Sequence, residues 1–111
     1  MHEAAIATAI IEVVDNCRDS RKLEKLTIDN GVFSGVFADS LIFYLEIILE
    51  EKGMKDVAIE VRETPAHCIC ACGNEYKVSV YIESCPVCGG FDRRITEGKN
   101  CVIESIEVAD G

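Results

Sequence analysis

No run of about 18 apolar residues occurs in this chain, so its sequence predicts no membrane-spanning helix. The first 20 residues also lack the basic segment, the long apolar run and the small-residue cleavage site of an export signal. The chain contains seven cysteines, and an odd number of thiols in metal-like spacing suits a reducing compartment better than a disulfide framework does. We therefore expect a cytoplasmic protein.

Positive charge is also scarce, because 11 Lys and Arg residues stand against 20 Asp and Glu residues, for a formal net charge of -9. A phosphate-binding surface needs clustered basic side chains. Near the cysteines only Arg93, Arg94 and Lys99 form such a cluster, and a group this small is typical of a solvated face. We expect no nucleic-acid partner. The sequence also lacks a catalytic constellation, so no enzymatic activity is predicted.

Two segments have the periodicity of amphipathic helices. Residues 3–20 place apolar side chains on one face, and Cys17 falls on that face, where a small core residue is expected. Residues 39–52 carry a second apolar stripe, and Asp39 or Ser40 is expected to cap its start.

Strands are predicted where apolar and polar residues alternate with a period of two. Such segments lie at residues 25–29, 57–63, 76–82 and 102–108. The stretch 89–100 holds three glycines and few apolar residues, and is expected to form a loop or a weak hairpin.

The order of these elements predicts an α+β fold, in which two helices pack on one face of a small three-stranded sheet. The cysteine-rich segment interrupts this domain as an inserted zinc-ribbon subdomain with two knuckles and four cysteines. We expect residues 1–64, completed by the C-terminal strand 101–109, to form the main domain. Residues 65–100 would form the zinc ribbon.

Five of the seven cysteines lie in two short clusters, each followed by glycine: Cys68, Cys70, Cys72, and then Cys85, Cys88. Two facing knuckles of this kind predict a tetrahedral four-cysteine zinc site. Cys85 and Cys88 have the usual two-residue spacing, and Cys72 completes the first cluster with either Cys68 or Cys70. Strand alternation puts both candidates on one face, so the residues alone leave the choice open.

The same spacing leaves two other functions open. Rubredoxin-type iron sites share the Cys-Pro-x-Cys-Gly pattern, which makes a rubredoxin-like electron carrier an alternative. A zinc-ribbon interaction module is a second alternative. Iron bound by thiolates absorbs visible light and zinc does not, so the colour of the pure protein separates the first alternative from a zinc protein.

The first three residues, Met1-His2-Glu3, offer a second set of metal donors. The α-amine, the His2 imidazole and the intervening backbone amide nitrogens can surround one ion in a plane, which suits Ni²⁺ or Cu²⁺ better than Zn²⁺. The amine and the imidazole must lose protons to bind, so acid should release the ion.

Several motifs together resemble the HypA/HybF family of nickel metallochaperones, which act in the maturation of NiFe hydrogenase. They are the opening Met1-His2-Glu3, the turn Gly31–Val36 leading to Asp39-Ser40-Leu41, the two knuckles, and the closing Ser105–Val108. The resemblance covers essentially the whole chain. It implies a nickel site made by the Met1 amine and His2, with Glu3 contributing its backbone and a side chain that can also bind. Asp39 is a nearby residue that can contribute.

The resemblance also implies a structural zinc, delivery of nickel to the hydrogenase large subunit, and cooperation with the GTPase HypB. The family's first knuckle is Cys-x-x-Cys, and aligning this chain from Pro65 puts the first ligand at Cys70, with one residue missing before Cys72. The implied zinc ligands are Cys70, Cys72, Cys85 and Cys88, with Cys68 as the alternative to Cys70. Whether the protein forms a homodimer, and whether urease is a second client, stays open.

Overall fold

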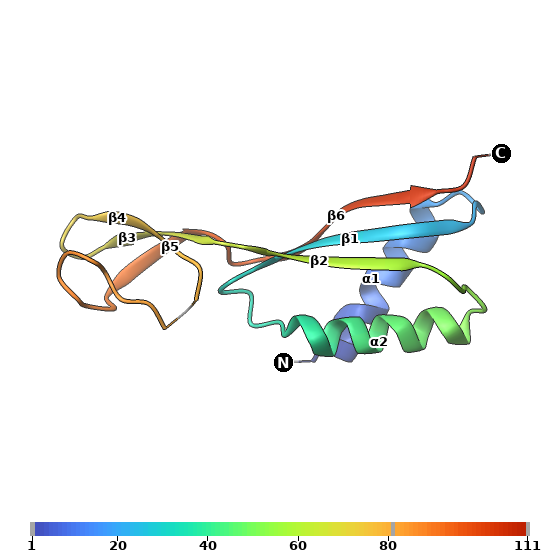
Figure 1. Ribbon diagram of the computed structural model, residues 1–111, viewed down its shortest axis with the longest axis horizontal. Helices are drawn as coiled ribbons and strands as arrows, with labels where there is room; N and C mark the ends of the chain where they lie inside the picture. Colours follow the sequence, from blue (N-terminus) through green and yellow to red (C-terminus); the bar gives the residue numbers. More distant parts are fainter. Residues whose placement is uncertain (1, 81, 111) are drawn as a thin grey trace.

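The computed structural model describes residues 2–80 and 82–110. Along the chain the elements are α1 (Glu3–Cys17), β1 (Leu23–Gly31), α2 (Ala38–Glu51), β2 (Ala58–Thr64), β3 (Ala66–Cys70), β4 (Glu75–Val78), β5 (Arg93–Glu97) and β6 (Cys101–Val108). Figure 1 shows them in two groups along one long axis, with β3, β4 and β5 at one end. The Cα radius of gyration is 17.0 Å, against about 13 Å for a compact chain of this length, so the molecule is elongated.

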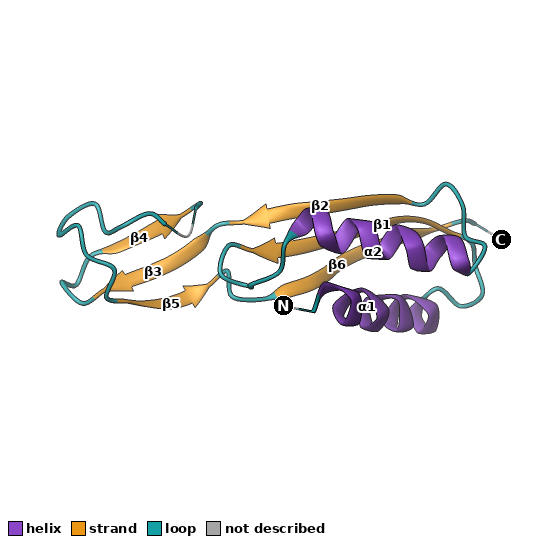
Figure 2. Ribbon diagram, turned by 90° about the horizontal axis from the view of Figure 1, so that it is seen from below, coloured by secondary structure: helices purple, strands orange, loops and turns teal. Residues whose placement is uncertain are grey.

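The larger group is a three-stranded sheet with the order β2-β1-β6, in which β1 runs parallel to β2 and antiparallel to β6. Both helices lie on one face of this sheet (Figure 2). The core between the helices and the sheet is built from buried aliphatic side chains, among them Ile11, Val14, Leu26, Ile28 and Leu45. The predicted α+β fold is thereby confirmed. Neither helix in the described part of the chain is long and apolar enough to cross a membrane.

The smaller group, hereafter the ribbon, is an antiparallel sheet with the order β4-β3-β5. Its buried centre is small and consists of Ala66, Cys68 and Val78. Strand β5 lies in the stretch expected to be a loop or weak hairpin, and β4 ends at Val78, earlier than predicted. Pairing with β3 creates β5, although its own sequence has little apolar alternation.

Backbone hydrogen bonds hold the chain segments together where they cross between the larger sheet and the ribbon: two reach the ribbon segment 65–100, and the third joins the loop after β1 to the end of β2. The amides of Gly31, Val32 and Phe33 donate to the carbonyls of Asn100, Thr64 and Gly98, at 2.9, 3.0 and 2.8 Å. Strand β2 also continues almost directly into β3. Hydrogen bonds therefore hold this junction, hereafter the crossing, and it is not a flexible linker.

The ends of the helices differ from the prediction. Helix α1 ends at Cys17, because Asp19 and Ser20 adopt the left-handed conformation at φ 53° and 60° and cannot continue a helix. Cys17 is the last helical residue and is exposed, so its expected burial was wrong. Helix α2 is preceded by Phe37, whose side chain offers no acceptor, so the expected cap at Asp39 or Ser40 was wrong as well.

Candidate metal centres

Four cysteines of the ribbon converge on one point. Cys70 ends β3, Cys72 lies in the turn that follows, and Cys85 and Cys88 lie in the segment between β4 and β5. Their Sγ atoms all lie within 4.8 Å of one another. The separation is 3.4 Å from Cys70 to Cys88 and 3.8 Å from Cys72 to Cys85. A tetrahedron with Zn–S bonds of about 2.3 Å has edges of about 3.8 Å, so the spacing fits one zinc ion.

Glycines and backbone amides shape the two knuckles. Gly73 and Gly89 have φ of 95° and 73°, which side-chain-bearing residues rarely adopt. Their amides donate to the carbonyls of Cys70 and Cys85 at 2.9 and 2.8 Å and close each turn. Two further donors face sulfur: the Gly90 amide lies 3.4 Å from Cys88 Sγ, and Asn74 Nδ2 lies 3.7 Å from Cys85 Sγ. Such donors stabilise thiolates.

The thiols affect one another's ionisation. The backbone amide of Cys88, helped by Asn74, lowers the pKa of Cys85 to about 6. For Cys70 the backbone amide of Cys72 acts in the same direction, but burial and the neighbouring sulfurs outweigh it and raise the pKa to about 12. Without an ion the four sulfurs cannot all ionise, because like charges at this distance repel. A divalent cation offsets that repulsion, so the four soft thiolate donors suit a thiophilic divalent ion such as Zn²⁺.

Cys68 lies outside this cluster. Its side chain is fully buried, 0% exposed, in the ribbon centre between Ala66 and Val78. Alternation along β3 does place Cys68 and Cys70 on the same buried face, but only Cys70 reaches the cluster. Cys101 is half-buried and packs against the main core.

The second candidate centre lies where the two helices begin. His2 is exposed and is the N-cap residue of α1, with its carbonyl accepting from the Ile6 amide at 3.1 Å. Met1, expected to supply the α-amine, lies outside the described residues. Glu3 is 8% exposed, and its Oε2 accepts a hydrogen bond from the Phe37 amide at 3.3 Å. Asp39 is exposed in the first turn of α2. The Glu3 contact therefore joins the beginning of α1 to the beginning of α2.

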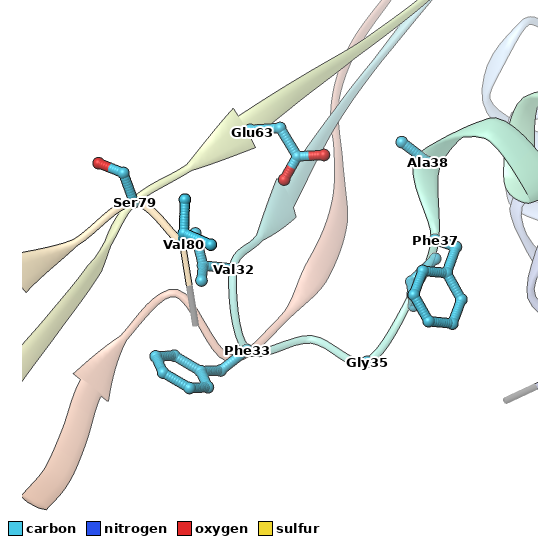
Figure 3. Close-up of a pocket in the computed structure, with 9 residues that line it drawn as sticks. Val32, Phe33, Gly35, Phe37, Ala38, Glu63, Ser79 and Val80 are labelled. Atoms are coloured by element: carbon cyan, nitrogen blue, oxygen red, sulfur yellow. The ribbon is translucent and has the colours of Figure 1, made fainter. Parts of the chain in front are cut away.

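Beside this contact between the starts of the two helices lies an apolar cavity of about 440 Å³, which sequence reasoning did not find. Its lining consists of Val32, Phe33, Gly35, Val36, Phe37, Ala38, Glu63, Ser79 and Val80. Figure 3 shows Phe33 and Phe37 at opposite ends of the loop that forms one wall. These residues come from separate segments, so no local pattern marks the cavity, although the Gly31–Val36 turn stands out in the sequence.

Besides the cavity, the sequence does not reveal the role of Arg93. Its neighbours in the chain indicate a solvated basic group, yet its guanidinium lies 5.1 Å from the Phe33 ring centre, 6.0 Å from Tyr76 and 5.5 Å from Phe91. It also donates to the Tyr76 hydroxyl at 3.1 Å. Cation–π contacts of this kind tie β5 to the loop after β1. The scattered aromatic residues gave no sequence signal for this arrangement.

A four-thiol ribbon on a small α+β domain defines a metal-binding protein. The family model described as hydrogenase/urease nickel incorporation, metallochaperone, hypA matches residues 1–108, and the chain belongs to this family. The resemblance seen in the sequence is thereby confirmed.

Relatives and solved structures agree with this assignment. Hydrogenase maturation factor HypA of Geobacter metallireducens is 27% identical over 109 residues, covering 97% of this chain and 99% of the relative. HypA of Caldanaerobacter subterraneus is 31% identical over 116 residues, with coverages of 97% and 99%. The solution structure of the Ni metallochaperone HypA from Helicobacter pylori matches with a TM-score of 0.65 at 20% identity, over 97% of each chain. At that identity the structural likeness shows the fold alone.

Proposed function

We propose that this protein carries Ni²⁺ at its amino terminus and releases it for incorporation into NiFe hydrogenase, while its ribbon holds a structural Zn²⁺. The observation that supports nickel binding most directly is the position of His2, exposed at the cap of α1. The first N–H groups of a helix have no acceptor within the helix. The amide nitrogens of His2 and Glu3 are therefore free to bind a metal ion after they lose their protons. The positive end of the helix dipole favours that loss. The Met1 amine and the His2 imidazole complete a set of nitrogen donors suited to Ni²⁺.

The two centres suit different tasks. Four cysteine ligands close a zinc site and leave no position for substrate, which is typical of structural zinc. A site at the exposed start of a helix remains open to solvent and to another protein, which suits cargo that must leave again. Protonation of the amine and the imidazole competes with the metal, so acid should favour release. We propose a carrier without catalytic activity of its own.

Membership of the family supports a proposal for the partners. The family's description names both hydrogenase and urease as destinations of nickel. We propose the hydrogenase large subunit as the recipient, the GTPase HypB as the cooperating protein, and the cytoplasm as the compartment.

Calorimetric titration of untagged, zinc-loaded protein with Ni²⁺ tests the amino-terminal site. His2→Ala is expected to abolish tight nickel binding, because it removes the imidazole donor. The chain has one other histidine, His67, which pairs with Glu75 in the ribbon at 3.1 Å. His67→Ala is therefore a matched control and should bind nickel like the wild type. Equal affinity in His2→Ala and the wild type would refute the site.

Metal analysis tests the ribbon site. Cys70→Ala should lower the zinc content or make zinc readily removable by a chelator, because it deletes one of four converging sulfurs. Cys68→Ala removes a buried thiol outside the cluster and should keep one zinc per chain. The opposite result would make Cys68 the ligand. A visible Fe–thiolate absorption in the purified protein would favour an iron carrier instead.

A further inference from the structure

Helix α2 begins without a capping side chain of its own. Phe37 occupies the cap position in an extended conformation, at φ -89° and ψ 120°, and its side chain cannot accept a hydrogen bond. Helix starts of this kind usually have Ser, Thr, Asp or Asn at the cap, because the first N–H groups need acceptors. The start of α2 therefore depends on an acceptor from elsewhere.

Glu3 supplies that acceptor from the other helix. Its Oε2 accepts from the Phe37 amide, and the two residues are 34 positions apart. In a capping box a Glu near the start of a helix accepts from the cap amide of its own helix. Here the same bond is made between two helices. The carboxylate also lies in the first turn of α1, where the helix dipole favours negative charge.

Burial makes this contact different from a surface hydrogen bond. Among the residues that the structure describes, Glu3 is the only charged residue that is buried, at 8% exposure. A carboxylate that left this place to bind a metal would leave the Phe37 amide without its acceptor. Leaving a partly buried donor unsatisfied is unfavourable.

We propose that Glu3 is a positioning residue: its carboxylate caps α2 and fixes the start of α2 beside His2, and it is not itself a nickel ligand. This inference rests on the proposed nickel site. His2 directly precedes Glu3, and Asp39 follows Phe37 by two residues. The cap therefore sets where the first turn of α2, with the exposed Asp39 carboxylate, stands relative to the amino-terminal donors.

Two substitutions separate a cap from a ligand. Glu3→Gln keeps an oxygen acceptor for the Phe37 amide and removes the carboxylate, whereas Glu3→Ala removes both. In nickel-free, zinc-loaded protein, hydrogen exchange of the Phe37 amide should quicken by about fivefold in Glu3→Ala, as expected for a cap worth about 1 kcal/mol. It should stay near the wild-type rate in Glu3→Gln. Nickel affinity, measured by calorimetry, should follow the same order.

The outcomes decide between the roles. An unchanged Phe37 exchange rate in Glu3→Ala would overturn the cap. A nickel affinity that falls equally in both variants, with the Phe37 amide still protected in Glu3→Gln, would make the carboxylate a ligand and also overturn the proposal. The exchange measurement needs no nickel, so it tests the cap even if His2→Ala shows that the amino terminus is not the nickel site. Zinc content and far-ultraviolet circular dichroism verify that both variants are folded.

Discussion

Gly98 combines a positive φ with close backbone neighbours, so one added methyl group there should be costly. Its φ is +85°, and a Cβ there would lie 2.7 Å from the Ala66 Cα and 3.0 Å from the Pro65 carbonyl oxygen. Both neighbours are backbone groups at the crossing between the ribbon and the larger sheet, so they cannot move aside cheaply. Gly98→Ala should therefore disturb the whole junction.

Gly53 provides the matched control for this substitution. It also has a positive φ, +73°, but nothing lies within 4 Å of the position that an added Cβ would occupy. Gly53→Ala should cost about 1 kcal/mol from backbone strain alone. Gly98→Ala should cost roughly 1–3 kcal/mol more, because overpacking adds to the strain. Urea unfolding of the zinc-loaded variants measures both, and equal losses would show that the crossing is loose.

Residues whose partners are distant in sequence were the hardest to predict. Local pattern places the cap of α2 at Asp39 or Ser40, whereas Glu3 of the other helix provides the acceptor. The choice between Cys68 and Cys70 could not be made from alternation, because both point to the buried face of β3. Local periodicity reports which face is buried and not what lies against it.

Between the two helices, the ion pairs of Asp15 form a link that depends on pH. Asp15 lies in α1 and accepts from Arg18 at 2.9 Å and from Lys52, just after α2, at 2.9 Å. The hydrogen bond from Lys52, followed by that from Arg18, lowers the pKa of Asp15. A lowered pKa means that the carboxylate stabilises the fold above the unfolded-state pKa, about 3.9, and that this stabilisation is lost as the pH falls through the folded-state pKa.

Asp15→Asn tests this link. The free energy of unfolding should fall by about 0.5–1 kcal/mol at pH 7, the range for a partly exposed pair. The difference from the wild type should shrink below about pH 4, where the wild-type carboxylate also becomes neutral. Urea unfolding of both proteins at each pH, repeated in Lys52→Met and in the double variant, isolates the interhelical pair. A difference that does not change with pH would point to packing instead of charge.

Elements with their own apolar stripe were predicted well. Both helices and the strands of the larger sheet have that stripe, since each buries one face in the same core. Strand β5 was missed because its sequence, Arg93-Arg94-Ile95-Thr96-Glu97, contains one aliphatic residue. Its pairing with β3 and the ring contacts of Arg93 hold it in place. A strand stabilised mainly by its neighbours has no periodicity of its own from which it could be predicted.

For the molecule as a whole, the decisive feature is that its two sheets have separate buried centres. The larger buried centre is formed by side chains from both helices and three strands, among them Leu26 and Leu45. The ribbon centre is limited to Ala66, Cys68 and Val78, with a few partly buried neighbours. A hydrophobic core of this size is too small to keep the ribbon folded without a cross-link or a bound metal. Bound zinc would supply the missing folding energy.

Removing zinc should therefore unfold one end of the molecule and leave the other folded. With a strong chelator, we expect the amides of β3, β4 and β5 to lose protection from hydrogen exchange, while those of β1, α1 and α2 keep it and the helical circular dichroism stays. Cys70→Ala should give the same pattern without chelator. This outcome would support domains at residues 65–100 and at 1–64 with 101–109. Loss of protection at both ends would instead show that the bonded crossing at Gly31 and Gly98 couples them into a single cooperative unit.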